Sequence, residues 1–200
     1  VGVGQACLRL NTTGFDSVAI GYNTLDAQTT ANSNIGVGME ALRYNQTGNN
    51  NVAIGVDALE DNTASNNTAV GHNALMNNTS GQYNVAVGSF ALDANTTADQ
   101  NTAIGYIALS ANTVGQNNTA LGTYSMLYNT SGNYNVGLGY GTLGNNTTAS
   151  NNTAVGYKAM DANTTGDNNV AVGSLTLDAN TTGTKNTAVG QAALGKNTTA

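Results

Sequence analysis

The 200-residue chain has no proline, no tryptophan, one cysteine and two phenylalanines, and only 8% of its residues are charged. Because the cysteine, Cys7, stands alone, an intrachain disulfide framework is excluded. Collagen is excluded because it needs glycine at every third position together with proline. Disordered chains are usually rich in proline, glutamate or lysine, which are scarce here. The absences therefore indicate an ordered protein without disulfide support.

Positive charge is also scarce. Five Lys and Arg residues against eleven Asp and Glu residues give a net charge of −6. Nucleic acids and anionic membrane surfaces are bound through clustered cations, so we expect no nucleic-acid partner. No apolar run approaches the ~18 residues of a membrane helix, so we expect no membrane insertion of this segment. The chain starts in mid-pattern with no visible signal peptide, which we interpret as a segment cut from a longer repetitive chain.

Asparagine and threonine are abundant, since Asn occurs 33 times and Thr 29 times, and both belong to a repeat. The phrase Asn-Thr/Val-Ala-Val/Ile-Gly recurs with a 17-residue period, interrupted by a single 16-residue interval. Complete repeats begin at Ser17, Asn34, Asn51, Asn67, Asn84, Asn101, Asn118, Asn135, Asn152 and Asn169. Residues 1–16 and 186–200 fit the same pattern as partial repeats. Twelve repeats without a linker predict a single repeat domain over residues 1–200.

The positions of the repeat, numbered 1 to 17 from this first residue, differ in what they admit. Position 3 is always Ala or Gly, position 5 is always Gly, position 9 is Leu or Met, and position 12 is Asn except at Gln28. Positions 6, 7, 10, 11, 16 and 17 vary, as expected of side chains that face solvent.

This pattern predicts an all-β fold, a parallel β-solenoid (β-roll) of about twelve 17-residue coils with two short strands per coil. Positions 1–4 alternate as a strand does, positions 7–11 around the Leu supply the second strand, and Asn-Thr-Thr-Gly closes the coil. We expect the branched residue at position 4 and the Leu at position 9 to be buried. The short repeat loses its residue at 62–64, in the return turn, where deletions are tolerated.

The segment Asp16-Ser17-Val18-Ala19-Ile20-Gly21-Tyr22 resembles the head repeat of YadA-like trimeric autotransporter adhesins, and residues 50–55 and 168–173 are similar to it. The similarity covers about six residues in each repeat, with a variant 17-residue period. It implies a left-handed parallel β-roll, three parallel chains and a place on the cell surface as the projecting part of an adhesin. A phage tail-fibre or another surface-fibre repeat is the alternative.

The small residues at position 3 have two interpretations. If positions 2 and 4 point inward, position 3 points outward and allows a second chain to approach closely, in a homo-oligomer. If position 3 points inward, the interior of the coil is thin. Under the first interpretation, the interface consists of the alanines at position 3, which are Ala19, Ala53, Ala69, Ala86, Ala103, Ala120, Ala154, Ala171 and Ala188.

No group of residues suits catalysis, so we expect no enzyme and no cofactor. The single His72 lies at a variable position without triad partners, and Cys7 occupies a position held elsewhere by Ala. The glycines at 137–141 belong to the repeat and are not a phosphate-binding loop. Asp161 and Asp178, at position 10 of consecutive repeats, are weak candidates for a cation site, with a solvated acidic edge as the alternative.

Two further features concern the Asn-Thr-Thr turn. Sequons make glycosylation conceivable at nine residues of position 12: Asn11, Asn45, Asn78, Asn95, Asn129, Asn146, Asn163, Asn180 and Asn197. The position keeps its Asn where the sequon is absent, at Asn62 and Asn112, which favours a structural role. Threonine-rich solenoids also include ice-binding proteins, but these present Thr-x-Thr on a flat strand, whereas here the Thr residues are adjacent.

The sequence thus favours a non-catalytic, structural and adhesive segment of an extracellular surface fibre, located at a cell surface or on a virion fibre. Its expected partners are further copies of itself and a host-surface or matrix ligand. The alternatives are an ice-binding β-solenoid and a phage tail-fibre shaft.

Overall fold

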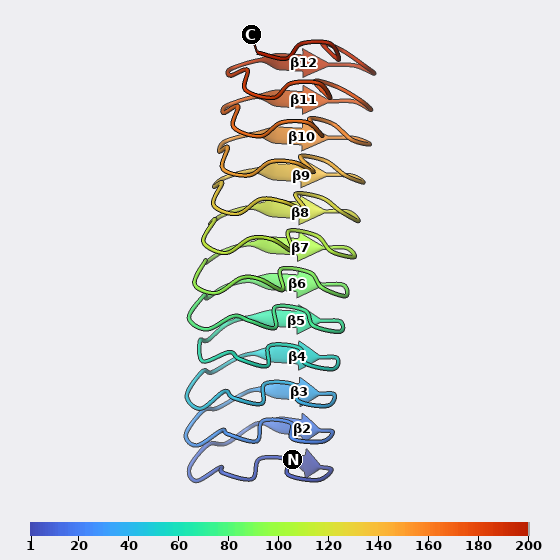
Figure 1. Ribbon diagram of the computed structural model, residues 1–200. Coiled ribbons are helices and arrows are strands. Elements are labelled where there is room, and N and C mark those ends of the chain that lie inside the picture. Colours follow the sequence, from blue (N-terminus) through green and yellow to red (C-terminus); the bar gives the residue numbers. More distant parts are fainter. Residues whose placement is uncertain (200) are drawn as a thin grey trace. The chain divides into compact units, whose positions relative to one another are not determined.

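The computed structural model describes residues 1–199, which form two compact units, residues 1–100 and the rest of the chain from Asn101 on. Each unit consists of stacked coils that follow the 17-residue repeat, and each coil contributes one strand to a parallel sheet (Figure 1). The coils are numbered after their strands, so that coil 1 contains β1 and coil 12 contains β12. Across residues 1–199 there is no helix, and hence no helix long and apolar enough to cross a membrane. The predicted all-β parallel solenoid is confirmed.

The strands occupy positions 2–4 of each repeat and pair in register with their neighbours within a unit. In unit 1 they are β1 (Gly2–Val3), β2 (Val18–Ile20), β3 (Ile35–Val37), β4 (Val52–Ile54), β5 (Thr68–Val70) and β6 (Val85–Val87). In unit 2 they are β7 (Thr102–Ile104), β8 (Thr119–Leu121), β9 (Val136–Leu138), β10 (Thr153–Val155), β11 (Val170–Val172) and β12 (Thr187–Val189). Ala53 faces Ala69 across β4 and β5, so the 16-residue repeat keeps its register, and the missing residue is absorbed in the turn.

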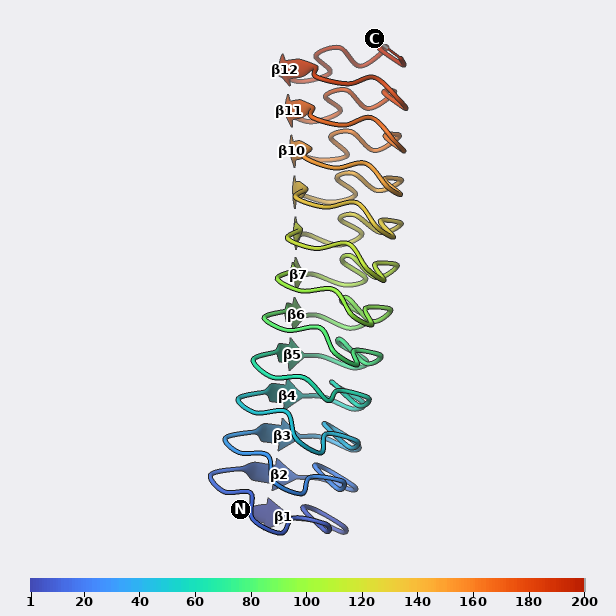
Figure 2. The ribbon, with the colours of Figure 1, turned by 90° about the vertical axis from the view of Figure 1, so that its left-hand side faces the viewer.

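The predicted second strand is absent from the described coils, and each has one strand instead of two. Positions 7 and 9 adopt a left-handed backbone conformation, as at Glu40 (φ 58°) and Leu42 (φ 54°) in coil 3. Residues with positive φ cannot continue a strand, so positions 7–11 form turns, which Figure 2 shows between the strands. Backbone bonds still join neighbouring coils there, for example from Leu42 N to Ala58 O (3.1 Å).

The strand presents the opposite face to the interior from the one expected. Ala19 and Ala53 at position 3 are completely buried, whereas Ile20 and Ile54 at position 4 are each 41% exposed. The burial predicted for position 4 is therefore wrong. The burial predicted for position 9 is confirmed, since the Leu or Met of coils 2–11 is fully buried.

The interior is thin because the position-9 side chains lie directly against the strand. A Cβ atom added to Gly36 would lie 3.5 Å from Leu25 Cγ and 2.7 Å from Thr24 Cγ2. Little room remains between strand and opposing turn, so only Ala or Gly fits at position 3. Branched residues at positions 2 and 4 then cover the outer face of the sheet.

Two columns of buried asparagine complete the interior. Asn34 at position 1 and Asn45 at position 12 both donate their Nδ2 to the carbonyl of Gly48, each at 2.8 Å. The pattern recurs in unit 2, where Asn118 and Asn129 both donate to Gly132. Buried amides need such partners, and these bonds close the return turn of each coil. This explains why position 12 keeps Asn without a sequon.

The invariant glycine at position 5 follows from contact between coils. Gly105 has φ 139°, and a Cβ atom on it would lie 2.6 Å from the carbonyl carbon of Gly122 in the next coil. A side chain there is excluded both by backbone conformation and by the close approach of the neighbouring backbone. Position 5 therefore fixes the stacking of the coils.

Candidate functional site

Four of the six variable positions, 6, 7, 10 and 11, lie in the turns that follow the strand and form one face of each coil. We call this the variable face. Its backbone is bonded from coil to coil, as from Tyr44 N to Glu60 O at 3.0 Å in unit 1. The side chains are free to differ because the fold depends on the buried positions 1, 3, 9 and 12. Three features of this face, one in unit 1 and two in unit 2, are candidates for function.

The first is a cluster of charged groups in unit 1. Glu40, Asp57 and Glu60 each place a carboxylate oxygen within 4.8 Å of the other two. Arg43 lies among them, with its Nη1 3.0 Å from Glu40 Oε2 and 3.7 Å from Glu60 Oε1. Burial raises the pKa of Asp57, and the Glu40 carboxylate raises it further. Burial likewise raises the pKa of Glu60, with a smaller contribution from Asp57.

Three carboxylates supply at most six of the six to eight oxygen ligands that Ca²⁺ takes in proteins, and only if each binds through both of its oxygens. Arg43 already neutralises part of their charge, so the arrangement is an ion-pair cluster. Sequence reasoning missed it, although acidic residues at position 7 of consecutive repeats, Glu40 and Asp57, were the available signal. Among residues 1–199 no other group of three potential ligands forms. Of the predicted pair Asp161 and Asp178, Asp161 forms an ion pair with Lys158, and the cation site at this pair stays a prediction.

The second feature is a column of tyrosine rings in unit 2. The rings of Tyr106 and Tyr124 meet edge to face with centroids 5.8 Å apart, and Tyr124 meets Tyr140 in the same way at 5.6 Å. Tyr140 and Tyr157 are stacked at 5.6 Å. Tyr106, Tyr140 and Tyr157 remain 45–50% exposed. Exposed aromatic rings with apolar faces and polar hydroxyls are typical of binding surfaces.

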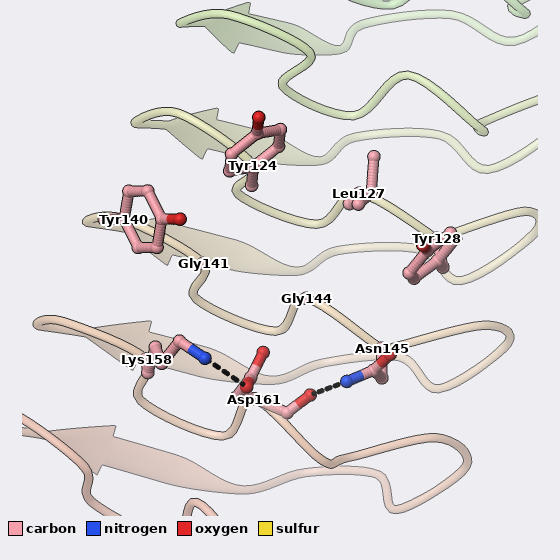
Figure 3. A pocket seen from close by; sticks show the side chains of 9 residues that line it. All are labelled: Tyr124, Leu127, Tyr128, Tyr140, Gly141, Gly144, Asn145, Lys158 and Asp161. Carbon is pink, nitrogen blue, oxygen red and sulfur yellow. Dashed lines mark hydrogen bonds and ion pairs between the residues drawn. The ribbon is translucent and has the colours of Figure 1, made fainter.

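The third feature is a hollow of about 260 Å³ beside this column, centred on coil 9 (Figure 3). Its floor is glycine, because coil 9 has Gly141 at position 7 and Gly144 at position 10, where neighbouring coils carry side chains. Coil 8 supplies Tyr124, Leu127 and Tyr128 to its wall, and coil 10 supplies Lys158 and Asp161.

The polar side of this hollow is held in place by its own bonds. Lys158 Nζ lies 3.3 Å from Asp161 Oδ2, and the Asp161 carboxylate raises the pKa of Lys158. Asn145 donates its Nδ2 to the Asp161 carbonyl at 3.0 Å. Figure 3 shows the tyrosine rings and the Lys158–Asp161 pair around the glycine backbone. The glycine at position 7 was the sequence signal for this hollow, because every other repeat has a side chain there.

The sequons at position 12 lie mainly in the interior. Asn45, Asn78, Asn95, Asn129, Asn146, Asn163 and Asn180 are fully buried and donate their Nδ2 to neighbouring groups. Glycosylation requires an accessible Nδ2, so these seven are wrong as acceptors in the folded chain. Asn11 and Asn197, in the first and last coils, are half-buried.

The alanines predicted to form an interface are also misplaced. Ala19, Ala53, Ala69, Ala86, Ala103, Ala120, Ala154 and Ala171 are fully buried and Ala188 is 4% exposed. Their side chains point into the coil, against position 9, so they cannot contact a second chain. The thin-interior interpretation of position 3 is the correct one.

The remaining candidates have local structural roles. The thiol of the half-buried Cys7 lies 3.0 Å from the Gly21 carbonyl. His72 meets the Phe90 ring edge to face at 5.1 Å. The Thr hydroxyls at position 13 donate to the next coil, as from Thr130 Oγ1 to Thr147 O at 3.0 Å.

No protein family, curated protein or solved structure matches the chain.

Proposed function

We propose that this chain is a non-catalytic structural and adhesive segment of an extracellular surface fibre, with the variable face as its binding surface. The observation that carries the proposal is that different positions of each coil have different roles. Buried positions 1, 3, 9 and 12 hold the stack, whereas positions 6, 7, 10 and 11 present different side chains from one coil to the next. Such a scaffold displays many side chains along one surface, as repeat proteins with extended binding faces do.

The clusters on the variable face are suited to binding and poorly suited to catalysis. The carboxylates of Glu40 and Glu60 are engaged by Arg43, and Asp161 is engaged by Lys158. Neither group includes a serine, threonine or cysteine whose hydroxyl or thiol a neighbouring base could activate as a nucleophile. A role in contact with another molecule accounts better for exposed tyrosines beside fixed ion pairs.

Self-association belongs to the same proposal, with a different surface from the predicted one. The outer face of the sheet carries branched apolar residues at position 4 and Val, Ile or Thr at position 2. In unit 2, Leu121, Val170 and Val172 are 44%, 36% and 37% exposed. A second copy of the chain, with the same apolar column, would cover this surface, and the burial would add up over many coils. The resemblance to trimeric adhesin heads supports a three-fold arrangement.

A surface-adhesive role is favoured over ice binding by the threonines. Their position-13 hydroxyls are engaged with backbone carbonyls of neighbouring coils, as at Thr130 and Thr164. Ice binding needs hydroxyls displayed as a regular flat array. Localisation at a cell surface or on a virion fibre follows from the adhesive role.

A bead-adhesion assay tests the proposal. Latex beads coated with the protein are compared with albumin-coated beads on fixed epithelial cells and on matrix-coated glass. We expect adhesion well above the albumin level, inhibited by soluble protein. Adhesion equal to that of albumin beads on every surface would contradict the proposed function.

A further inference from the structure

We propose that the hollow on coil 9 of unit 2 is a binding site for a neutral saccharide, an inference that rests on the adhesive function proposed above. The occupant is one or two sugar units of a longer glycan. The argument depends on how the space arises, on the chemistry of its walls and on the state of its backbone groups.

The space exists because one coil lacks a side chain at position 7, whereas at position 10 of that coil the Asp161 Oδ1 atom lies 2.5 Å from where a Cβ atom of Gly144 would stand. Position 7 is glycine only at Gly141, and position 10 is glycine at Gly144. Both glycines are buried at the floor of the hollow. A Cβ atom on Gly141 would lie 3.4 Å from Lys158 Cγ, an ordinary contact distance. The left-handed backbone does not require glycine there either, because Phe90 occupies the same position of coil 6 with φ 56°.

The walls of the hollow have two different characters. Tyr124, Tyr128 and Tyr140 offer aromatic surface on one side, and the Lys158–Asp161 pair offers a hydrogen-bond donor and an acceptor on the other. A pyranose ring has the same division, with an apolar face of C–H groups and a rim of hydroxyls. Hydroxyls can both donate to Asp161 and accept from Lys158. Because the pair carries no net charge, it favours a neutral occupant over an anion or a cation.

The aromatic surface is held in position before any ligand arrives. Tyr124 is fixed against Tyr106 and Tyr140, and Tyr140 is stacked on Tyr157. Asp161 is held by Lys158, and its backbone carbonyl accepts a bond from Asn145. Groups that are already ordered lose little conformational entropy on binding, which matters for a small, open site.

A peptide fits the hollow less well, because the backbone at its rim is already paired. Tyr128 N donates to Gly144 O at 3.1 Å, and Asn145 N donates to Asp161 O at 3.0 Å. An extended peptide that binds by adding a strand needs an unpaired edge. The groups left to recognise a ligand are side chains, which suits a saccharide.

Binding is tested by saturation-transfer NMR on the whole protein, with cellotetraose, maltotetraose, mannotetraose and chitotetraose as probes at millimolar concentration. The side-chain resonances of Tyr124, Tyr128 and Tyr140, which line the hollow, report the site. A tyrosine-containing tripeptide is a further probe. The hollow is small and open, so we expect at least one saccharide to bind with a dissociation constant on the order of 1 mM. Failure of all four saccharides to bind would overturn the proposal. So would the tripeptide shifting these resonances when no saccharide does.

Two variants locate the binding. Gly141→Phe fills the hollow with a residue that the repeat tolerates, and should abolish saccharide binding while the circular dichroism spectrum stays unchanged. Asn23→Phe makes the same addition at position 7 of coil 2, outside the hollow, and should leave binding unchanged. Tyr140→Leu should weaken binding about three- to tenfold through loss of the ring face. Equal binding by Gly141→Phe and the wild type would overturn the assignment of the site.

The bead assay separates this inference from the proposed function. If the protein-coated beads adhere but no saccharide binds, the saccharide site is wrong and the adhesive function stands. If wild-type beads do not adhere, the adhesive function fails whatever the NMR result.

Discussion

The buried asparagine column makes a strong prediction at Asn163, in coil 10. Its Nδ2 donates to Asn146 Oδ1 at 3.1 Å and to Gly166 O at 3.0 Å, and its Oδ1 accepts from Asn180 Nδ2 at 3.0 Å. The side chain is completely buried. Asn163→Ala removes all three hydrogen bonds. The buried Asn146 Oδ1 then loses the hydrogen bond that it accepts from Asn163 Nδ2.

The expected cost follows from these losses. Each hydrogen bond contributes about 1 kcal/mol, and a buried acceptor left without its donor costs a further 1–3 kcal/mol. Gly166 O keeps its bond from Asn152 and Asn180 keeps its bond to Gly183, so the damage is limited. We expect a loss of about 4–6 kcal/mol in the free energy of unfolding, or roughly 8–24 °C in melting temperature.

Urea unfolding followed by circular dichroism measures this loss, and amide hydrogen exchange shows whether it is confined to the coils around Asn163. The matched control is Asn145→Ala, in the preceding coil, which removes one bond from an exposed side chain and should cost about 1 kcal/mol or less. Equal losses in the two variants would refute the structural role assigned to the asparagine column.

Three further predictions concern the stacking, the outer sheet face and the charge cluster. Gly105→Ala should cost at least about 2–4 kcal/mol, because its Cβ would enter the backbone of the next coil, and calorimetry showing a loss below about 1 kcal/mol would contradict this. Leu121→Lys should weaken self-association in sedimentation equilibrium without unfolding the chain, whereas Ala120→Lys should disrupt its coil. A variant pair with the reverse behaviour would contradict the outward placement of position 4. Asp57 has a raised pKa in the folded state, so its ionisation destabilises the fold as pH rises above the unfolded value of about 4. Asp57→Asn should therefore be more stable than the wild type in urea unfolding at about pH 7, with the difference vanishing near pH 3. A constant difference across this range would refute the assignment.

The sequence by itself determined the repeat and most of its consequences. A 17-residue period with one 16-residue interval, a fixed Gly at position 5 and Leu or Met at position 9 predicted coils stacked in register, and burial of position 9 followed from it. The 16-residue repeat located the return turn, because a deletion elsewhere would have shifted Ala53 and Ala69 out of register. The Asn at position 12 kept its place at Asn62 and Asn112 without a sequon, which indicated its structural role.

The tertiary structure alone decided which face of the strand points inward. An alternating strand can place either of its two faces toward the interior, and a shift of one residue moves every side chain to the other face. Branched residues at positions 2 and 4 favoured one orientation, but the space between strand and turn is too thin for them and admits only Ala or Gly. That thickness depends on the left-handed residues at positions 7 and 9, where Leu25 and Leu42 gave no local sign of positive φ. The hollow at Gly141 likewise depends on side chains of three successive coils, which the period brings together but only the folded stack places around one space.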